Sequence, residues 1–370
     1  MNLNLGTNSM KIIAVSGINL YEGGPLSVYY DFLDSIIASG YDKKYKIIAF
    51  VHRKQLFDKY EDKVQIVELP KSRRSYIHRL YYEFYFFKKI SKHVDVDIWI
   101  SLHDITPNVN ARKVYTYCHN VSPFIEKNIK NIRYSFTNVV FSYLYKYIYR
   151  LNIKHATSII VQTNWMRNAF LKMYPIKNVI VAKPDIKIDY QVKKISRCVQ
   201  KKRFIFPAFP RYFKNFEIIC EAAREIDATK AEIILTLDGS ENAYSRALLK
   251  KYSDVKSISW IGLQSREKIY ELYNDVDCLI FPSMMETWGL PISEFKITQK
   301  DMIIIDLPYA RETLGEYMHA LFFKPKNVES LRERILSVIE NRQMYSATEN
   351  VQIAPPVVTG WKALIELISK

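Results

Sequence analysis

Glu286 and Glu294 bracket the stretch of sequence that is best suited to chemistry. An apolar run ending at Phe281 leads into a turn that holds Glu286 and Gly289, and Glu294 follows in a segment whose pattern predicts a helix. The first amides of a helix are unpaired and its dipole is positive there, so the region around Gly289 predicts an anion site between two acidic side chains. We expect a nucleotide diphosphate at that site, with one carboxylate on each side to hold hydroxyl groups.

The elements that must position these residues begin in the first half of the chain, where short apolar runs alternate with longer amphipathic segments. A turn at Gly23 and Gly24 separates the first run from a helical pattern over 26–38. This alternation predicts an α/β domain with a parallel sheet. The expected strands are residues 11–18, 45–51, 64–69, 98–102, 114–118, 159–162 and 179–182.

The second half repeats this architecture after a polar, basic stretch that we interpret as a linker. We predict strands at 204–207, 233–237, 258–261, 278–281, 303–305 and 321–323, and helices at 216–226, 267–273, 328–339 and 361–368. The fold class is therefore α/β, with two Rossmann-like doubly wound domains facing a central cleft. We expect an N-terminal domain at 1–184, a linker at 185–202, a C-terminal domain at 203–355 and a last helix at 356–370 that packs back on the N-terminal domain.

Ligands of such sheets bind outside the carboxyl ends of the strands, and the polar residues of interest fall at these ends. They are Gly23, Gly24, His103, Asp104 and His119 in the first half and Arg211, Lys214 and Glu286 in the second. His103 and Asp104 suit a binding site and a loop brace equally well, and the sequence leaves both interpretations open.

The composition is that of a folded, basic protein. The chain has 370 residues, 48% hydrophobic and 25% charged, with a formal net charge of +16 and a pI near 9.4. No apolar run is long enough to span a membrane and no export signal is evident, so we expect a cytoplasmic protein. The four cysteines are scattered singly, which favours reduced thiols. A basic surface attracts nucleic acid, anionic lipid and phosphorylated substrates alike.

Two basic, aromatic-rich segments stand apart in the first half, at 71–93 and 127–154. Both patterns predict amphipathic helices. Such helices suit an anionic membrane surface, where Tyr lies near the headgroups and Lys or Arg against lipid phosphates. The alternative is that the aromatic faces pack on the sheet while the charges are merely solvated.

With these residues in place, the chain resembles the glycosyltransferases of family 4, which are retaining enzymes of the two-domain GT-B fold. The strongest similarity is the run from Phe281 to Glu294, followed by Asp306, Arg311, Glu312 and Gly315. The segment 207–217 is similar to the family's phosphate-binding loop, and the Gly23-Gly24 turn to its N-terminal glycine loop. Arg211 lies closer to Lys214 than in most members, and Asn120 follows His119 where many members have Asp.

The resemblance implies roles for individual residues. Glu294 holds the ribose hydroxyls of the donor, and Glu286 lies beside the transferred sugar. His119 lies near the sugar and the reaction centre, while the diphosphate is neutralised by cations and amides. The residues implied in that contact are Gly23, Gly24, Arg211, Lys214, Trp288, Gly289 and Leu290.

No metal or other cofactor is expected. Fixed cations and oriented amides stabilise a leaving diphosphate without one. The two Asp-x-Asp pairs, at 95–97 and 275–277, precede predicted strands, at the end away from the expected cleft. Family members are thought to use no protein nucleophile, so none is assigned.

We therefore predict a hexosyltransferase-type, retaining glycosyltransferase on the cytoplasmic face of a bacterial inner membrane. It moves a sugar from a nucleotide sugar donor to a growing, lipid-linked glycan of the O-antigen or capsule type, as in lipopolysaccharide biosynthesis. The expected partners are the donor, a glycan or lipid-linked oligosaccharide acceptor and an anionic membrane surface, with no nucleic acid. The alternatives are a catalytically silent subunit that binds a nucleotide sugar or glycan, and a basic nucleic-acid-binding protein.

Overall fold

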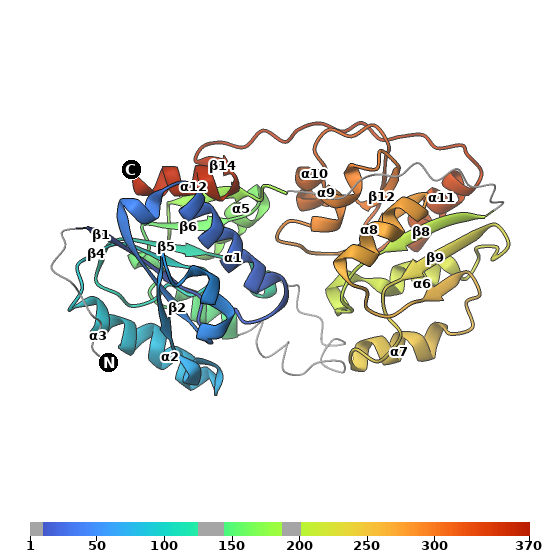
Figure 1. The fold of residues 1–370 in the computed structure, drawn as a ribbon. Helices are drawn as coiled ribbons and strands as arrows, with labels where there is room; N and C mark the ends of the chain where they lie inside the picture. Colours follow the sequence, from blue (N-terminus) through green and yellow to red (C-terminus); the bar gives the residue numbers. More distant parts are fainter. Residues whose placement is uncertain (1–9, 125–143, 187–200) are drawn as a thin grey trace. The chain divides into compact units, whose positions relative to one another are not determined.

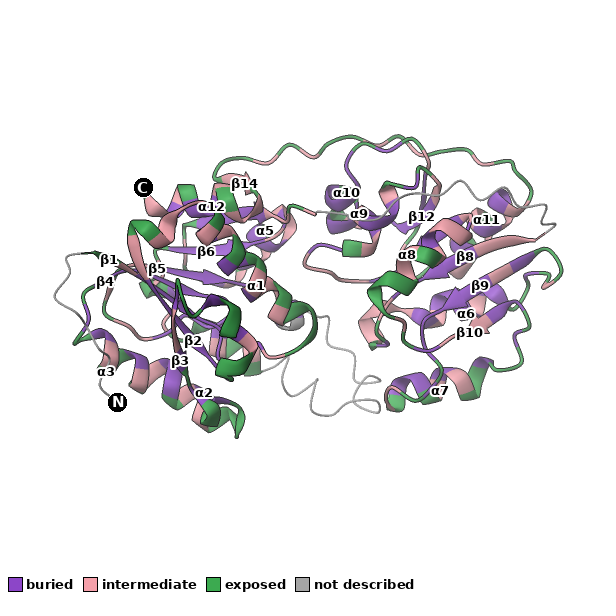
Figure 2. Ribbon diagram, in the orientation of Figure 1, coloured by how far each residue is buried: buried purple, intermediate pink, exposed green. Residues whose placement is uncertain are grey.

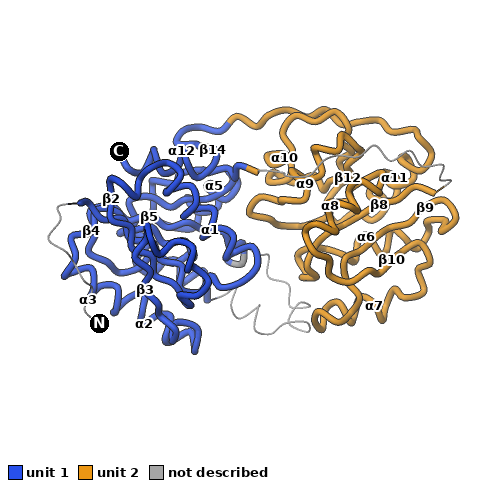
Figure 3. Tube along the Cα trace, in the orientation of Figure 1, with its two compact units in different colours: residues 1–123, 142–185, 353–370 blue, residues 124–141, 186–352 orange. Residues whose placement is uncertain are grey.

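The chain forms two compact units in the computed structural model, which describes residues 10–124, 144–186 and 201–370. The first unit comprises residues 1–123, 142–185 and 353–370, and the second comprises 124–141 and 186–352 (Figure 3). Most of the expected linker, residues 187–200, lies outside the described residues, as does most of the second basic segment, up to residue 143.

The first unit is built on a parallel sheet with the order β14-β7-β6-β5-β4-β1-β2-β3 (Figure 1). Central β1 pairs on both sides, so that Ile13 lies opposite Ile47 of β2 and Ile98 of β4. The strands are β1 (Lys11–Ser16), β2 (Tyr45–Val51), β3 (Gln65–Glu68), β4 (Val96–Ser101), β5 (Ala111–Tyr117), β6 (Ser158–Val161), β7 (Val179–Lys183) and β14 (Val357–Thr359).

Both faces of this sheet are buried, because side chains alternate along each strand and helices cover both sides. Ile13 and Val15 pack with the helices α1 (Gly23–Ala38) and α12 (Gly360–Ser369). Ala14 packs on the opposite face with Phe87. That face is covered by one continuous helical segment made of α2 (Tyr76–Tyr81), a π-helical turn η4 (Tyr82–Phe86) and α3 (Phe87–Ser91). α5 (Asn164–Met173) connects β6 and β7.

The second unit has a parallel sheet with the order β10-β9-β8-β11-β12-β13. Its strands are β8 (Lys202–Phe206), β9 (Ala231–Leu235), β10 (Ile258–Trp260), β11 (Cys278–Phe281), β12 (Asp301–Ile305) and β13 (Ala320–Phe323). Its helices are α6 (Phe216–Ala223), α7 (Ala243–Tyr252), α8 (Arg266–Asp275), α9 (Leu290–Lys296), α10 (Pro308–Leu314) and α11 (Val328–Ile339). Figure 2 shows the buried strands between helices whose outer faces are exposed.

The strand orders define where each sheet can hold a ligand. In the second unit β8 lies between β9 and β11. The connection that follows β8 and the connection that follows β11 therefore run on opposite faces of the sheet. In the first unit β1 lies between β2 and β4 in the same way. A crevice opens at such a switch point, beside the carboxyl ends of the two strands. The loops after β8 and β11, and those after β1 and β4, are therefore the places to look for a site.

The fold expected from the sequence is confirmed: two α/β units, each with a parallel sheet. Every predicted strand is present, with ends that shift by a few residues. The sequence did not predict β14, which is only three residues long and pairs with β7 next to α12. It also missed α7, whose start is marked by a capping box between Asn242 and Ser245.

Candidate functional site

The loops after β8 and β11 bring together two of the predicted site residues. Lys214 Nζ lies 2.5 Å from Glu286 Oε1, and both side chains are largely buried, at 18% and 14% exposure. An ion pair that is shielded from water is stronger than one on an open surface, but its charges cost more to desolvate. The cation is thus held at the switch point of the sheet by a carboxylate, ready to pair with another anion.

Backbone contacts hold these two loops against each other. Met284 N donates to Phe213 O at 2.8 Å, and Asn215 Nδ2 donates to Pro282 O at 3.3 Å. Asn215 has a φ of 60°, a left-handed conformation that Asn adopts more readily than most residues. The turn at Asn215 therefore directs Lys214 toward Glu286 while the chain enters α6.

Gly289 forms the junction between the Glu286 turn and α9. Its φ is 95°, which a residue with a Cβ adopts only under strain. Trp288 is held on both sides, since its Nε1 donates to Ser293 Oγ at 3.0 Å and its carbonyl accepts from Thr313 Oγ1. Leu290, the first residue of α9, is 49% exposed. Because α9 is only seven residues long, the amides at this turn contribute more than any helix dipole.

Glu294 lies just over one turn into α9, and α8 surrounds its carboxylate. Oε1 accepts from Tyr270 at 3.3 Å and lies 3.5 Å from Arg266 Nη2, while Oε2 accepts from Tyr273 at 3.5 Å. Burial raises the pKa of Glu294, and Arg266 and the two tyrosines only partly oppose that shift. These contacts are long, so the carboxylate retains capacity for closer donors such as vicinal hydroxyls.

Arg211 lies in the same turn as Lys214 but is not drawn into the ion pair. Lys214 N donates to Arg211 O at 2.9 Å, which closes the turn, while the Arg211 guanidinium lies 5.8 Å from the Phe209 ring centre. Both Arg211 and Phe209 are exposed. Of the two predicted cations, the structure thus brings only Lys214 into contact with the Glu286 turn.

The predicted site residues of the first unit lie on the loops that follow β1 and β5. Gly23 begins α1 with a φ of 60°, and both Gly23 and Gly24 face open space. The amides of this first turn are therefore accessible. His119 follows β5 with a side chain that is 14% exposed, and its backbone N–H donates to Asp104 Oδ1 at 2.9 Å.

Behind His119 lies a buried polar cluster that the sequence did not predict as a unit. His103 Nε2 lies 2.8 Å from Glu83 Oε1, and both side chains are fully buried. Arg79 Nη2 donates to His103 O at 2.8 Å. Burial lowers the pKa of Arg79, but the charges of Tyr145, Glu83 and Asp104 outweigh it and the net shift is upward. The π-helical turn that carries Glu83 is itself a signal, since such turns are frequent at functional sites.

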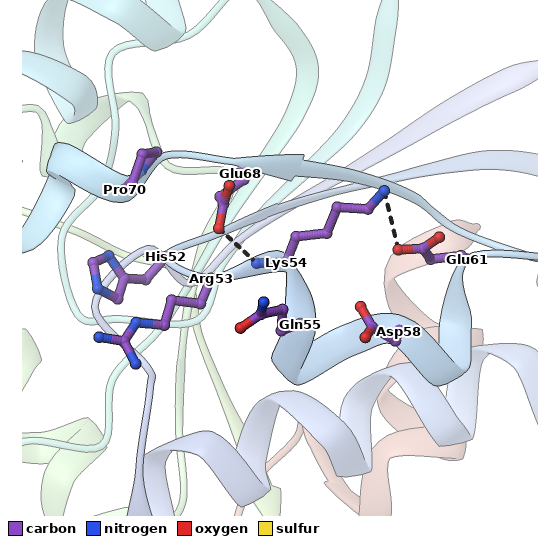
Figure 4. Close-up of a pocket in the computed structure, with 8 residues that line it drawn as sticks. All are labelled: His52, Arg53, Lys54, Gln55, Asp58, Glu61, Glu68 and Pro70. Carbon is purple, nitrogen blue, oxygen red and sulfur yellow. Dashed lines mark hydrogen bonds and ion pairs between the residues drawn. The ribbon is translucent and has the colours of Figure 1, made fainter.

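A pocket of the first unit lies away from these residues, beyond the ends of β2 and β3. Its volume is about 550 Å³, and Figure 4 shows Lys54 reaching toward Glu61 across it, with Glu68 at its side. Most of its side chains are exposed, and none is a residue predicted for the donor site. The pocket is lined by His52, Arg53, Lys54, Gln55, Asp58, Glu61, Glu68 and Pro70.

An exposed aromatic and basic surface covers the outside of the α2–α3 segment and the adjoining helical residues 144–150. Arg79 Nη1 donates to the Tyr145 hydroxyl at 3.3 Å, which places the two helices side by side. The exposed apolar side chains are Tyr76, Ile77, Tyr81, Tyr85, Leu144, Tyr147 and Leu151. Exposed cations accompany them: Arg73, Arg74, Lys88, Lys89, Lys92, Lys146, Arg150 and Lys154. The one acidic residue within 71–93 and 144–155, Glu83, is buried. We call this region the aromatic–basic surface.

Among the described residues, no helix is both long and apolar enough to cross a membrane. No group of three or more His, Cys, Asp or Glu side chains in those residues is arranged to hold a metal ion. Cys118, Cys220 and Cys278 are buried free thiols.

Solved structures with a similar fold include glycosyltransferases. The lipopolysaccharide outer core galactosyltransferase WaaB in its apo form is 12% identical and has a TM-score of 0.63, with 91% of this chain and 92% of that chain covered. A glycosyltransferase from Rickettsia africae is 16% identical with a TM-score of 0.63, covering 90% and 89%. Anabaena Alr3699/HepE, solved with UDP-glucose, is 13% identical with a TM-score of 0.56, covering 89% and 90%. The fold is therefore the GT-B fold of these enzymes.

The sequence of the second unit matches a known family. Residues 190–351 match the family model described as Glycosyl transferases group 1. This segment contains Lys214, Glu286 and Glu294. No curated protein matches the chain in sequence. The match to the group 1 glycosyltransferases thus covers most of the second unit.

Proposed function

We propose that this protein is a retaining glycosyltransferase that moves a sugar from a nucleoside diphosphate sugar to a growing, lipid-linked cell-surface glycan. The observation that carries the proposal is the Lys214–Glu286 pair at the switch point of the second sheet, with buried Glu294 eight residues after Glu286. Anabaena HepE binds UDP-glucose on a similar fold, which supports a nucleotide sugar as the donor. The lipopolysaccharide enzyme WaaB supports a cell-surface glycan as the product.

In the proposed reaction, Lys214 stabilises the diphosphate as the bond to the sugar breaks. Lys214 leaves Glu286 for the phosphates, and Glu286 then faces the transferred sugar. The amides at Trp288 and Gly289 add hydrogen bonds. Fixed cations and amides in a water-poor site are the kind of groups that lower the barrier for such a leaving group. Lys214 supplies positive charge that a divalent cation supplies elsewhere, so we propose a metal-independent enzyme.

Glu294 anchors the donor in this proposal, because an ionised carboxylate accepts from both ribose hydroxyls. Gly23 and Gly24 offer exposed amides to the diphosphate, Arg211 adds positive charge, and His119 contacts the sugar near the reaction centre. The acceptor attacks on the face that the diphosphate leaves, without a protein nucleophile.

The aromatic–basic surface supports a location on the cytoplasmic face of a bacterial inner membrane. Its tyrosines, Ile77 and cations match the chemistry of an anionic lipid surface, where aromatic rings lie among headgroups and Lys or Arg contact phosphates. A lipid-linked acceptor is presented at such a surface, so this location serves the proposed reaction.

The test begins with thermal shift against UDP, GDP, ADP and dTDP, because a ligand that binds the folded state raises its stability. Hydrolysis and transfer of the matching nucleotide sugars are then measured for Lys214→Ala and Glu294→Ala. We expect Lys214→Ala to lower turnover by about 100-fold, as for loss of one group that stabilises a leaving oxyanion. We expect Glu294→Ala to weaken donor binding by about 10- to 100-fold. Activity should persist in EDTA.

The matched control is Lys268→Ala, which removes an exposed cation of the same unit, 2.7 Å from Glu271. Lys268→Ala should behave like the parent enzyme. Unchanged binding and turnover in both Lys214→Ala and Glu294→Ala would show that the site lies elsewhere. Donor binding without transfer to any extract acceptor would indicate a silent subunit instead.

A further inference from the structure

Asp104 touches His119 at two points. Its Oδ1 accepts from the His119 backbone N–H at 2.9 Å, and its Oδ2 lies 3.8 Å from His119 Nε2. Asp104 itself is 6% exposed and has a φ of 75°. A left-handed conformation is strained for a residue other than glycine, and Asp is among the residues that tolerate it best. The fold thus maintains a strained turn that places a carboxylate beside His119 and the buried hydroxyl of Tyr149.

The buried cluster behind Asp104 holds that carboxylate in place. His103 Nε2 lies 2.8 Å from Glu83 Oε1, and His103 Nδ1 lies 2.5 Å from Asn19 Oδ1. Arg79 then balances the charge of Asp104, and its bond to His103 O fixes the backbone next to Asp104. Buried charges in proteins are paired in this manner. The negative charge that His119 meets is therefore set by the fold.

The opposite ring nitrogen of His119 has no such partner. Within the described residues, Nδ1 of His119 is buried and has no hydrogen-bond partner. A carboxylate beside Nε2 favours a proton on that nitrogen, which leaves Nδ1 as a hydrogen-bond acceptor. Buried polar atoms are nearly always satisfied, so an open acceptor calls for a donor from outside the unit. A sugar hydroxyl is a donor of the right kind.

We propose that Asp104 is a positioning residue that holds His119 with its proton on Nε2, so that Nδ1 accepts a hydrogen bond from a hydroxyl of the transferred sugar. The proposal rests on the proposed function, because it is that function which places the sugar beside His119. Arg79, Glu83 and His103 support Asp104 from behind. Asp104 thus acts through His119, not on the substrate.

The test is Asp104→Asn, a change that keeps the shape, the tolerance of a left-handed backbone and an oxygen for the His119 amide. The charge facing Nε2 is lost, and with it one of the charges that balance Arg79. We expect kcat for hydrolysis of the selected nucleotide sugar to fall about 10- to 100-fold, since small errors in orientation have effects of that size. Donor affinity should not change, whereas the thermal midpoint should fall, because buried Arg79 loses one of its counter-charges. In a His119→Ala background, Asp104→Asn should have no further effect.

The matched control is Asn152→Asp, the reverse exchange at another left-handed position of the same unit, where φ is 62° and Nδ2 donates to Pro107 O. This variant should keep full turnover. Nitrogen NMR of the histidine rings supplies a readout that needs no substrate: Asp104→Asn should change the tautomer signal of His119, and Asn152→Asp should not.

An unchanged His119 signal, or losses that add in the double variant, overturns the positioning role. Full turnover in His119→Ala overturns the role of His119 in the proposed site, and with it the catalytic part of this inference. The two failures are distinguishable, because the NMR signal reports the Asp104–His119 contact whatever the rate.

Discussion

Glu286 and Glu294 are the same residue type in one short segment, and the fold gives them different surroundings. Glu286 faces a cation at 2.5 Å, whereas Glu294 lies among two tyrosines and Arg266 at 3.3 to 3.5 Å. In the proposed reaction, Glu286 loses Lys214 as its partner when a diphosphate binds. Glu294 is fixed by burial, so its carboxylate can accept from a ligand without moving. These surroundings support a role in turnover for Glu286 and in affinity for Glu294.

The raised pKa of Glu294 predicts that donor binding weakens in mild acid. Burial is the main cause of the shift, and only the ionised form accepts from both ribose hydroxyls. The donor Kd should therefore rise as pH falls through the raised pKa of Glu294, in calorimetric titrations from about pH 8 to about pH 5. Glu294→Gln should bind more weakly and with a flatter pH dependence. An equally steep dependence in Glu294→Gln would assign the titration to another group.

The raised pKa of Glu294 affects the stability of the fold in the opposite direction to donor binding. The loss of donor binding in acid can therefore be separated from acid unfolding. A carboxyl whose pKa is raised in the folded state contributes stability below its unfolded value of 4.5 and loses that contribution as pH rises through the folded value. Glu294 thus adds to the stability of the fold in the same range where donor binding is lost. Weaker binding there cannot come from destabilisation by this group.

The sequence predicted Lys214, Glu286 and Glu294 as site residues, and the structure brings Lys214 and Glu286 into contact. It could not identify their neighbours. Tyr270 and Tyr273 look like ordinary helix residues until α8 packs beside α9 and turns their hydroxyls to Glu294. Such partners come from distant parts of the chain and depend on side-chain direction, which a hydrophobic pattern does not specify.

At the scale of elements, the segment from α2 to α3 has two different faces, one buried and one exposed. Arg79, Glu83 and Phe87 point inward, while Ile77 and Tyr85 are 79% and 60% exposed. The sequence predicted an amphipathic helix here and left open whether its aromatics pack on the sheet or face outward. Both occur, because the segment carries more aromatics than one buried face can accept. The π-helical turn shifts the register between α2 and α3, a detail that no periodicity of the sequence reveals.

The outer face of this segment yields a prediction about lipid binding. Replacing Ile77 and Tyr85 by Glu removes apolar area and adds repulsion from an anionic surface, so binding should fall by about 10-fold or more. The measurement is cosedimentation with phosphatidylcholine–phosphatidylglycerol vesicles at low and high salt. Leu263→Glu is the control, since Leu263 is 52% exposed and lies in the second unit. Equal loss in Leu263→Glu, or none in the double variant, would exclude the aromatic–basic surface as the lipid contact.

At the scale of the whole molecule, the first unit is completed by the end of the chain. β14 pairs with β7, and α12 packs on α1, where Trp361 meets Phe32 edge-on at 5.4 Å between ring centres. Figure 1 shows the last helix beside the first. The sequence predicted a helix here that packs back on the N-terminal domain, and the contacts that hold it join residues more than three hundred positions apart, such as Ser369 and Tyr41. The stability of the first unit therefore depends on residues that follow the second unit in sequence.

This arrangement predicts that core changes at the end of the chain loosen the first unit selectively. Leu364 is 1% exposed in the core around Phe32, so Leu364→Ala should lower the free energy of unfolding by about 2–5 kcal/mol. Hydrogen exchange should accelerate in peptides from α1 and β1 and remain slow in α6 and β11. Leu331→Ala is the counterpart, because Leu331 is fully buried on α11 of the second unit and should produce the reverse pattern. If both variants accelerated exchange equally in both units, the two units would unfold as one, and nucleotide binding by the second unit would depend on the last helix of the chain.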